Sequence, residues 1–216
     1  MINTILFDLD GTIIDSEPAA LQSILDCTQA WGVPVTKEDA ASVAGKKWEV
    51  AFDLLYAKHQ MPLPQEEASR LIVARYKELV HSSLQVVPGS VAAVQDFAKH
   101  FQLAVVSGSL RSDIFWALEH LKIIQHFQHI LGSEDYPLSK PAPDGYLKAI
   151  KLFGADPKHT LIFEDSAPGI ASAQAAGVKV VAVTSTNHYG HDQSTADAHI
   201  KNFEGITADW VKAKFP

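Results

Sequence analysis

Short apolar runs rich in valine and isoleucine recur along this chain, separated by stretches with helical periodicity. The apolar runs span residues 3–9, 102–108, 129–133, 160–165 and 178–185. Continuous apolar strands of this length are typical of a parallel sheet that is buried on both faces. The helical stretches between them span residues 90–101, 111–123, 144–154 and 167–177. Strands that alternate with helices predict a doubly wound α/β fold around one parallel sheet.

The alternation is interrupted after the first apolar run. From residue 16 to residue 83 the sequence has only helical patterns, which are separated by glycine and proline. We therefore expect an all-helical domain of residues 16–83, inserted into a core domain of residues 1–15 and 84–216. Ligands of open α/β sheets bind outside the carboxyl ends of the strands, so an inserted domain at this point is expected to act as a lid.

The charge and the cysteine content exclude several classes of partner. The 216 residues carry a formal net charge of −7 and a single cysteine. An acidic chain lacks the basic face that nucleic acids and membrane surfaces usually require. One cysteine cannot form an internal disulfide, and no apolar run is long enough to cross a bilayer. We expect a cytoplasmic protein with no nucleic-acid or membrane partner, and a monomer by default.

Chemically active side chains follow the ends of the predicted strands. They are Asp8 and Asp10 after the first strand, Ser107, Gly108 and Ser109 after the second, Glu164 and Asp165 after the fourth, and Lys140 shortly before the helix at 144–154. Because the carboxyl ends of parallel strands share one edge of a sheet, we expect these groups to converge. By contrast, the stretch STNHYGHD (185–192) has no usual zinc-ligand spacing, and we predict a polar surface loop there.

The gathered carboxylates require a nearby cation. Asp8, Asp10, Asp165 and Glu164 together offer the oxygen ligands that a hard divalent cation prefers, and Mg²⁺ is the best candidate. Ser107 and the backbone amides that follow Asp8 and Ser107 are suited to hold the oxygens of an anion. Beside Mg²⁺ and a lysine, the simplest such anion is a phosphoryl group.

A two-step phosphoryl transfer follows from these parts. Asp8 attacks phosphorus and forms an aspartyl-phosphate. Mg²⁺ and Lys140 screen the approaching carboxylate from the phosphate charge and stabilise the transition state. Asp10 protonates the leaving alkoxide and then accepts a proton from the water of the second step.

Four segments resemble the four motifs of the haloacid dehalogenase superfamily, in the right order and spacing. They are FDLDGT (7–12), VVSGS (105–109), SKPAPD (139–144) and LIFEDSAPGI (161–170). The resemblance covers essentially the whole chain and is closest to the beta-phosphoglucomutase-like branch. It implies a Rossmann-like core with a helical C1 cap.

The resemblance also implies roles for individual residues. Asp8 is the nucleophile, Asp10 the acid and base, and Ser107 and Lys140 the partners of phosphate and nucleophile. Mg²⁺ is held by Asp8, the backbone carbonyl of Asp10 and Asp165, with Glu164 binding directly or through water. Gly108 and Ser109 are candidate phosphate contacts. Glu17 and Lys47 are candidate substrate contacts from the inserted domain.

Several activities compete within this superfamily. Its dehalogenases lack an aspartate two positions after the nucleophile, so Asp10 favours phosphoryl chemistry. Its sugar phosphomutases carry a histidine where this chain has Ala20, and an arginine in the specificity loop where residues 44–50 offer only lysines. A phosphonoacetaldehyde hydrolase-like enzyme needs a Schiff-base lysine, which Lys46 and Lys47 do not clearly match. We predict a phosphatase of a small sugar or polyol phosphate, with a phosphomutase as the alternative and a non-catalytic binding protein as the third hypothesis.

Overall fold

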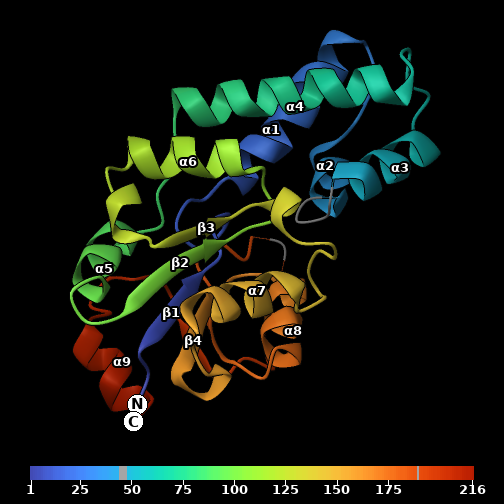
Figure 1. The fold of residues 1–216 in the computed structure, drawn as a ribbon. Helices are drawn as coiled ribbons and strands as arrows, with labels where there is room; N and C mark the ends of the chain where they lie inside the picture. The colour runs from blue at the N-terminus through green and yellow to red at the C-terminus, as the bar shows by residue number, and fades with distance from the viewer. Residues whose placement is uncertain (44–47, 189) are drawn as a thin grey trace. The chain divides into compact units, whose positions relative to one another are not determined.

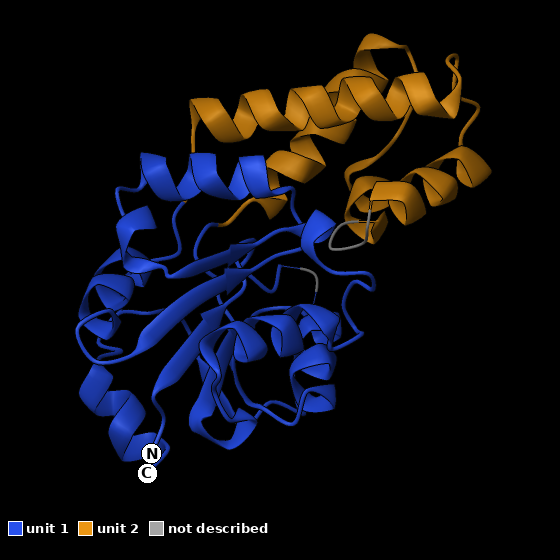
Figure 2. Cartoon of the chain, in the orientation of Figure 1, with its two compact units in different colours: residues 1–14, 86–216 blue, residues 15–85 orange. Residues whose placement is uncertain are grey.

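The computed structural model describes residues 1–43, 48–188 and 190–216 (Figure 1). The chain divides into two compact units, one of residues 1–14 and 86–216 and the other of residues 15–85 (Figure 2). None of the helices in the described part of the chain is long and apolar enough to span a membrane. The assignment of residues 16–83 as a lid domain stays a prediction.

The first unit is built on a parallel sheet, which confirms the predicted α/β class. Among the described residues the sheet has six strands in the order β3-β2-β1-β4-β5-β6. These strands are β1 (Thr4–Phe7), β2 (Gln102–Val106), β3 (His129–Leu131), β4 (Thr160–Glu164), β5 (Lys179–Val183) and β6 (Ala198–Ile200). The sequence did not predict β6, because its three residues lie in a polar stretch without an apolar run.

Side chains of alternate strand residues pack on opposite faces of the sheet. On one face Leu6 and Ile162 belong to a buried apolar cluster with Tyr146 and Ile170. On the other face Phe7 stacks on Phe163, with ring centroids 5.3 Å apart. Both faces are therefore covered, as the continuous apolar runs predicted.

Helices pack on both faces of the sheet. They are α5 (Ser90–Phe97), α6 (Arg111–His120), α7 (Asp144–Phe153), α8 (Ala167–Ala175) and α9 (Ala208–Lys214). Figure 1 shows α7 and α8 on one side of the sheet and α5 and α9 on the other. α8 begins where the Ser166 hydroxyl accepts a hydrogen bond from the Gly169 amide, and α7 ends at Gly154 in the left-handed region.

The unit of residues 15–85 has its own apolar core. Its helices are α1 (Glu17–Ala30), α2 (Lys37–Val43), α3 (Trp48–Lys58) and α4 (Gln65–Ser82), and its described residues include no strand. Ile24, Val43, Phe52, Leu55 and Ile72 are almost fully buried in one cluster. Each unit therefore buries an apolar core of its own.

Candidate active site

The strand register places the predicted residues at one edge of the sheet. Phe7 lies opposite Val105 on β2 and Phe163 on β4. The residues that follow these three positions, Asp8, Val106 and Glu164, therefore lie at the same level, where β1, β2 and β4 end. Asp8 is the first of them, and its backbone amide still donates to the Phe163 carbonyl at 3.0 Å.

A tight turn follows Asp8 and Asp10. Gly11 has a φ of 80°, a left-handed conformation that favours glycine. A Cβ at this position would overlap the Asp165 carboxylate, so the turn also needs glycine for close approach. The Thr12 hydroxyl donates to Asp165 Oδ1 at 3.4 Å. The turn after β1 and the end of β4 are thus in direct contact.

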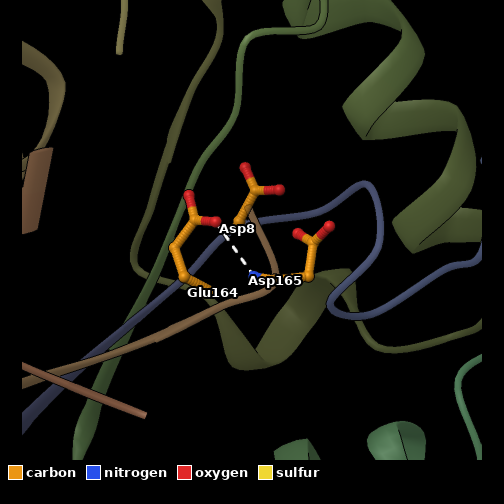
Figure 3. Close-up of side chains that lie close together, drawn as sticks. All are labelled: Asp8, Glu164 and Asp165. Carbon is orange, nitrogen blue, oxygen red and sulfur yellow. Dashed lines mark hydrogen bonds between the residues drawn. The ribbon is translucent and has the colours of Figure 1, made fainter. Parts of the chain in front are cut away.

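Asp8, Glu164 and Asp165 form a cluster of carboxylates (Figure 3). Each offers one oxygen, and these oxygens lie within 4.8 Å of one another. Glu164 is fully buried, and its Oε2 accepts hydrogen bonds from the Asp165 amide at 3.0 Å and the Ser166 amide at 3.1 Å. The cluster has the ligand chemistry and the spacing for a divalent cation.

Lys140 is the cationic partner of this cluster. Its Nζ lies 2.6 Å from Asp8 Oδ1 and 2.5 Å from Glu164 Oε1. The Tyr146 hydroxyl donates to the same Glu164 oxygen at 2.9 Å, and the Lys140 ammonium lies 5.1 Å from the centre of the Tyr146 ring. The segment before α7 therefore brings one lysine between two carboxylates at the carboxyl ends of two different strands, β1 and β4.

The protonation equilibria indicate an excess of negative charge. Burial, together with the Glu164 and Asp10 carboxylates, raises the pKa of Asp8 to about 7 although Lys140 opposes the shift. Burial would raise the pKa of Glu164, but the Lys140 ion pair and hydrogen bonds lower it overall. Burial would lower the pKa of Lys140, but Asp8 and Glu164 raise it well above its ordinary value. One lysine does not balance these carboxylates, so the residues present fit a bound metal cation.

Asp10 is held by the loop that follows β2. Its Oδ2 accepts hydrogen bonds from the Ser109 hydroxyl at 2.7 Å and from the Ser107 hydroxyl at 3.3 Å. The Ser109 amide donates to the Ser107 hydroxyl at 3.0 Å. Ser107 is buried, whereas Gly108 between the two serines is exposed. Asp10, the acid and base candidate, is therefore in direct contact with Ser107 and Ser109, the candidate phosphate contacts.

The structure describes one of the two substrate-contact candidates from residues 16–83. Glu17 lies in the first turn of α1, within the unit of residues 15–85. Lys47 lies outside the described residues. Substrate contact by either residue stays a prediction.

Sequence reasoning missed several side chains that support the site. Tyr146 occupies an apolar position of a helix, and only its hydroxyl on Glu164 reveals its role. Thr186 and Gln193 are buried, with exposed fractions of 4% and 7%. The prediction of a surface loop over residues 185–192 is therefore wrong for Thr186, because its hydroxyl bonds inward to Gly11. A polar residue type gives no signal of such a contact.

Comparison with known proteins finds a family model and named relatives that match most of the chain. The family model described as haloacid dehalogenase-like hydrolase matches residues 5–183. A phosphoglycolate phosphatase of Mesorhizobium japonicum is 29% identical over 93% of this chain and 87% of its own length. The hexitol phosphatase B of Escherichia coli is 27% identical over 94% of this chain and 93% of its own length.

A solved structure carries the same fold. A putative beta-phosphoglucomutase from Thermotoga maritima superposes with a TM-score of 0.82 over 98% of this chain and 99% of its own. Its sequence identity is 21%, so this likeness bears on the fold alone.

Proposed function

Because the chain belongs to the haloacid dehalogenase-like hydrolases, we propose that it is a magnesium-dependent phosphatase that hydrolyses a small phosphorylated metabolite through an aspartyl-phosphate. One observation carries the proposal. Lys140 Nζ lies within 2.6 Å of both Asp8 and Glu164, beside a three-carboxylate cluster at the carboxyl edge of the sheet. This arrangement provides a buried carboxylate nucleophile with positive charge next to it.

The proposed metal ligands are Asp8, Asp165 and the backbone carbonyl of Asp10, with Glu164 direct or through water. The surplus of carboxylates over lysine and the raised pKa of Asp8 support a cation at this position. Mg²⁺ bound there would supply positive charge that offsets the repulsion between a phosphate and the carboxylates. It would also keep Asp8 ionised, as a nucleophile must be.

In the first step an Asp8 oxygen forms a bond to phosphorus, and the bond between phosphorus and the substrate oxygen breaks. Asp10 gives its proton to that leaving oxygen. Lys140 holds the Asp8 carboxylate in place and offers positive charge to the phosphoryl oxygens. Ser107 and Ser109, together with the backbone at Gly108, orient those oxygens.

In the second step a water molecule attacks the phosphorus of the aspartyl-phosphate. Asp10 takes the proton of that water, Asp8 leaves as a carboxylate, and inorganic phosphate is released. The hydrogen bonds from Ser109 and Ser107 to Asp10 Oδ2 support this role, because they fix the orientation of a partly exposed side chain.

The named relatives support a small phosphorylated metabolite as substrate, and the hexitol phosphatase supports a polyol phosphate in particular. One relative is a phosphoglycolate phosphatase and another a hexitol phosphatase. A phosphomutase would return the phosphate to a sugar instead of giving it to water. The beta-phosphoglucomutase structure from Thermotoga maritima is only 21% identical to this chain. It bears on the fold alone and does not favour the mutase reaction.

The proposal is tested by phosphate release from a panel of sugar, polyol and nucleotide monophosphates, with Mg²⁺ and with EDTA. We expect release that requires Mg²⁺ and favours one compact sugar or polyol phosphate. Asp8→Asn should abolish it, whereas Asp209→Asn, at an exposed aspartate of α9, should not. Activity that survives in Asp8→Asn would exclude the covalent route. No phosphate release across the panel, together with isomerisation of a hexose 1-phosphate that needs a bisphosphate primer, would favour the mutase.

A further inference from the structure

The segment between β5 and β6 buries two polar side chains beside the carboxylate cluster. Most residues between Thr184 and Asp197 are partly or fully exposed, but Thr186 and Gln193 are not. Thr186 donates a hydrogen bond to the Gly11 carbonyl in the turn that follows β1, and Gln193 donates to the Val183 carbonyl at the end of β5. Buried polar groups with such partners fix the backbone that they contact.

Gln193 joins the carboxyl ends of β4 and β5. The ladder between these strands runs to the pair Glu164 and Ala182. Asp165 follows Glu164 in the chain, and Val183 follows Ala182. Gln193 Nε2 donates to the backbone carbonyls of both Asp165 and Val183, and the Val183 contact is 2.9 Å long. A side-chain amide has two N–H groups, so it satisfies both carbonyls at the point where strand pairing stops.

Thr186 holds the turn that follows β1. Its hydroxyl donates to the Gly11 carbonyl at 2.5 Å. Gly11 comes directly after Asp10, and its Cα approaches the Asp165 carboxylate so closely that a Cβ would overlap it. A shift of this turn would therefore move Asp165 as well as the two aspartates that precede it.

The segment is itself anchored. His199 on β6 places Nε2 2.9 Å from the Gln193 carbonyl oxygen, where an Nε2–H group donates. Asn187 donates to the His191 carbonyl at 2.8 Å and accepts from the His191 amide at 2.7 Å. These hydrogen bonds hold the backbone on which Gln193 and Thr186 lie.

We propose that Gln193 and Thr186 are positioning residues for the metal site. Gln193 sets the backbone at Asp165, and Thr186 sets the turn after Asp10, so together they fix the separation of the carboxylates from β1 and β4. The inference rests on the proposed function, since it concerns the same cation. Partners that orient metal ligands typically change metal affinity by about 10- to 100-fold when they are removed.

The test measures Mg²⁺ affinity by isothermal titration calorimetry, with the metal alone as ligand. Gln193→Met keeps the length of the side chain but removes both donors, and Thr186→Val replaces the hydroxyl with a methyl group. We expect each to raise the Kd for Mg²⁺ by about 10- to 100-fold. In the phosphatase assay saturating Mg²⁺ should restore most of kcat, because neither residue takes part in the chemistry.

Two matched controls are available in the same unit. Gln174→Met removes a side-chain amide that donates to the Thr195 carbonyl of the same segment, away from the strand ends. Thr160→Val removes a buried hydroxyl that donates to the Asp156 carbonyl at the opposite end of β4. Both controls should bind Mg²⁺ with the affinity of the parent protein.

The outcomes separate this inference from the proposed function. If the parent protein binds no Mg²⁺, the proposed function fails and the inference fails with it. If the parent binds Mg²⁺ and the two variants bind it equally well while their Tm falls, the residues serve folding alone and the inference is overturned. If Gln193→Met does not fold, the one-atom change in Thr186→Val decides the result.

Discussion

At the scale of the residue, the charge at Asp8 is the most informative feature of the site. Its pKa of about 7 reflects burial and two neighbouring carboxylates, opposed by Lys140. A carboxyl group with a raised pKa keeps its proton to higher pH in the folded, metal-free protein. The stability that this proton contributes is fully present below the unfolded pKa and is lost as the pH rises through about 7.

This leads to a prediction for metal binding. A metal ligand must lose its proton, so Mg²⁺ and the Asp8 proton compete below pH 7. We expect the apparent Kd for Mg²⁺ to rise about tenfold for each pH unit below 7 and to level off above it. Calorimetry in two buffers of different ionisation enthalpy should detect the released proton. In Asp8→Asn this step is absent, and a tenfold dependence that persisted there would assign the proton to another group.

Two buried tyrosines provide a second prediction at this scale. Tyr146 donates to the buried Glu164 carboxylate at 2.9 Å, whereas Tyr136 donates to the neutral Ser107 carbonyl at 2.7 Å. Hydrogen bonds to charged groups contribute about 1.5–3 kcal/mol and those between neutral groups about 0.5–1.5 kcal/mol. Tyr146→Phe should therefore lower the free energy of unfolding more than Tyr136→Phe does, as measured by urea denaturation. Equal losses would mean that Lys140 alone satisfies Glu164 Oε1.

At the scale of the element, α8 packs its first turn directly on Glu164. A Cβ at Gly169 would overlap the Glu164 carboxylate. Alanine in place of glycine inside a helix normally adds about 1 kcal/mol of stability. Here the sign should reverse, because Glu164 would have to leave Lys140. We expect Gly169→Ala to lower both the Tm and the affinity for Mg²⁺.

The control lies two residues further along the same helix. Ala171 is exposed on α8, so Ala171→Gly should cost about 1 kcal/mol of stability through helix propensity alone and leave Mg²⁺ binding intact. If Gly169→Ala instead stabilised the protein, the contact between α8 and Glu164 would have to be looser than the structure describes.

The same elements explain what could be predicted from the sequence. The strands β1, β2, β4 and β5 are apolar runs buried on both faces, and parallel pairing then places Asp8, Ser107 and Glu164 at one edge. These residues were predictable because the carboxyl ends of parallel strands lie at the same edge of the sheet in whatever order the strands are arranged. The supporting residues Tyr146, Thr186 and Gln193 were not predictable, because their partners are set by tertiary packing. The edge strand β6 is too short to leave a periodic pattern.

At the scale of the whole molecule, the carboxylate cluster belongs to one unit only. Asp8 lies in residues 1–14, and Lys140, Glu164 and Asp165 lie in residues 86–216. The helices of residues 15–85 bury a separate apolar cluster that includes Ile24, Phe52 and Ile72. Metal binding should therefore stabilise the first unit directly, since a ligand stabilises the state that binds it.

Hydrogen exchange followed by mass spectrometry tests this division. Adding Mg²⁺ without substrate should slow amide exchange in the peptides that carry the turn after β1, the end of β4 and the segment after β5. Peptides from α4 should exchange at the same rate with Mg²⁺ and with EDTA, because their amides open through the separate core of residues 15–85. Protection that spread equally into α4 would show that the two units respond to the metal as one cooperative structure. Protection confined to the three strand-end peptides, and reduced in Asp8→Asn at the same Mg²⁺ concentration, would assign the metal response to the carboxylate cluster.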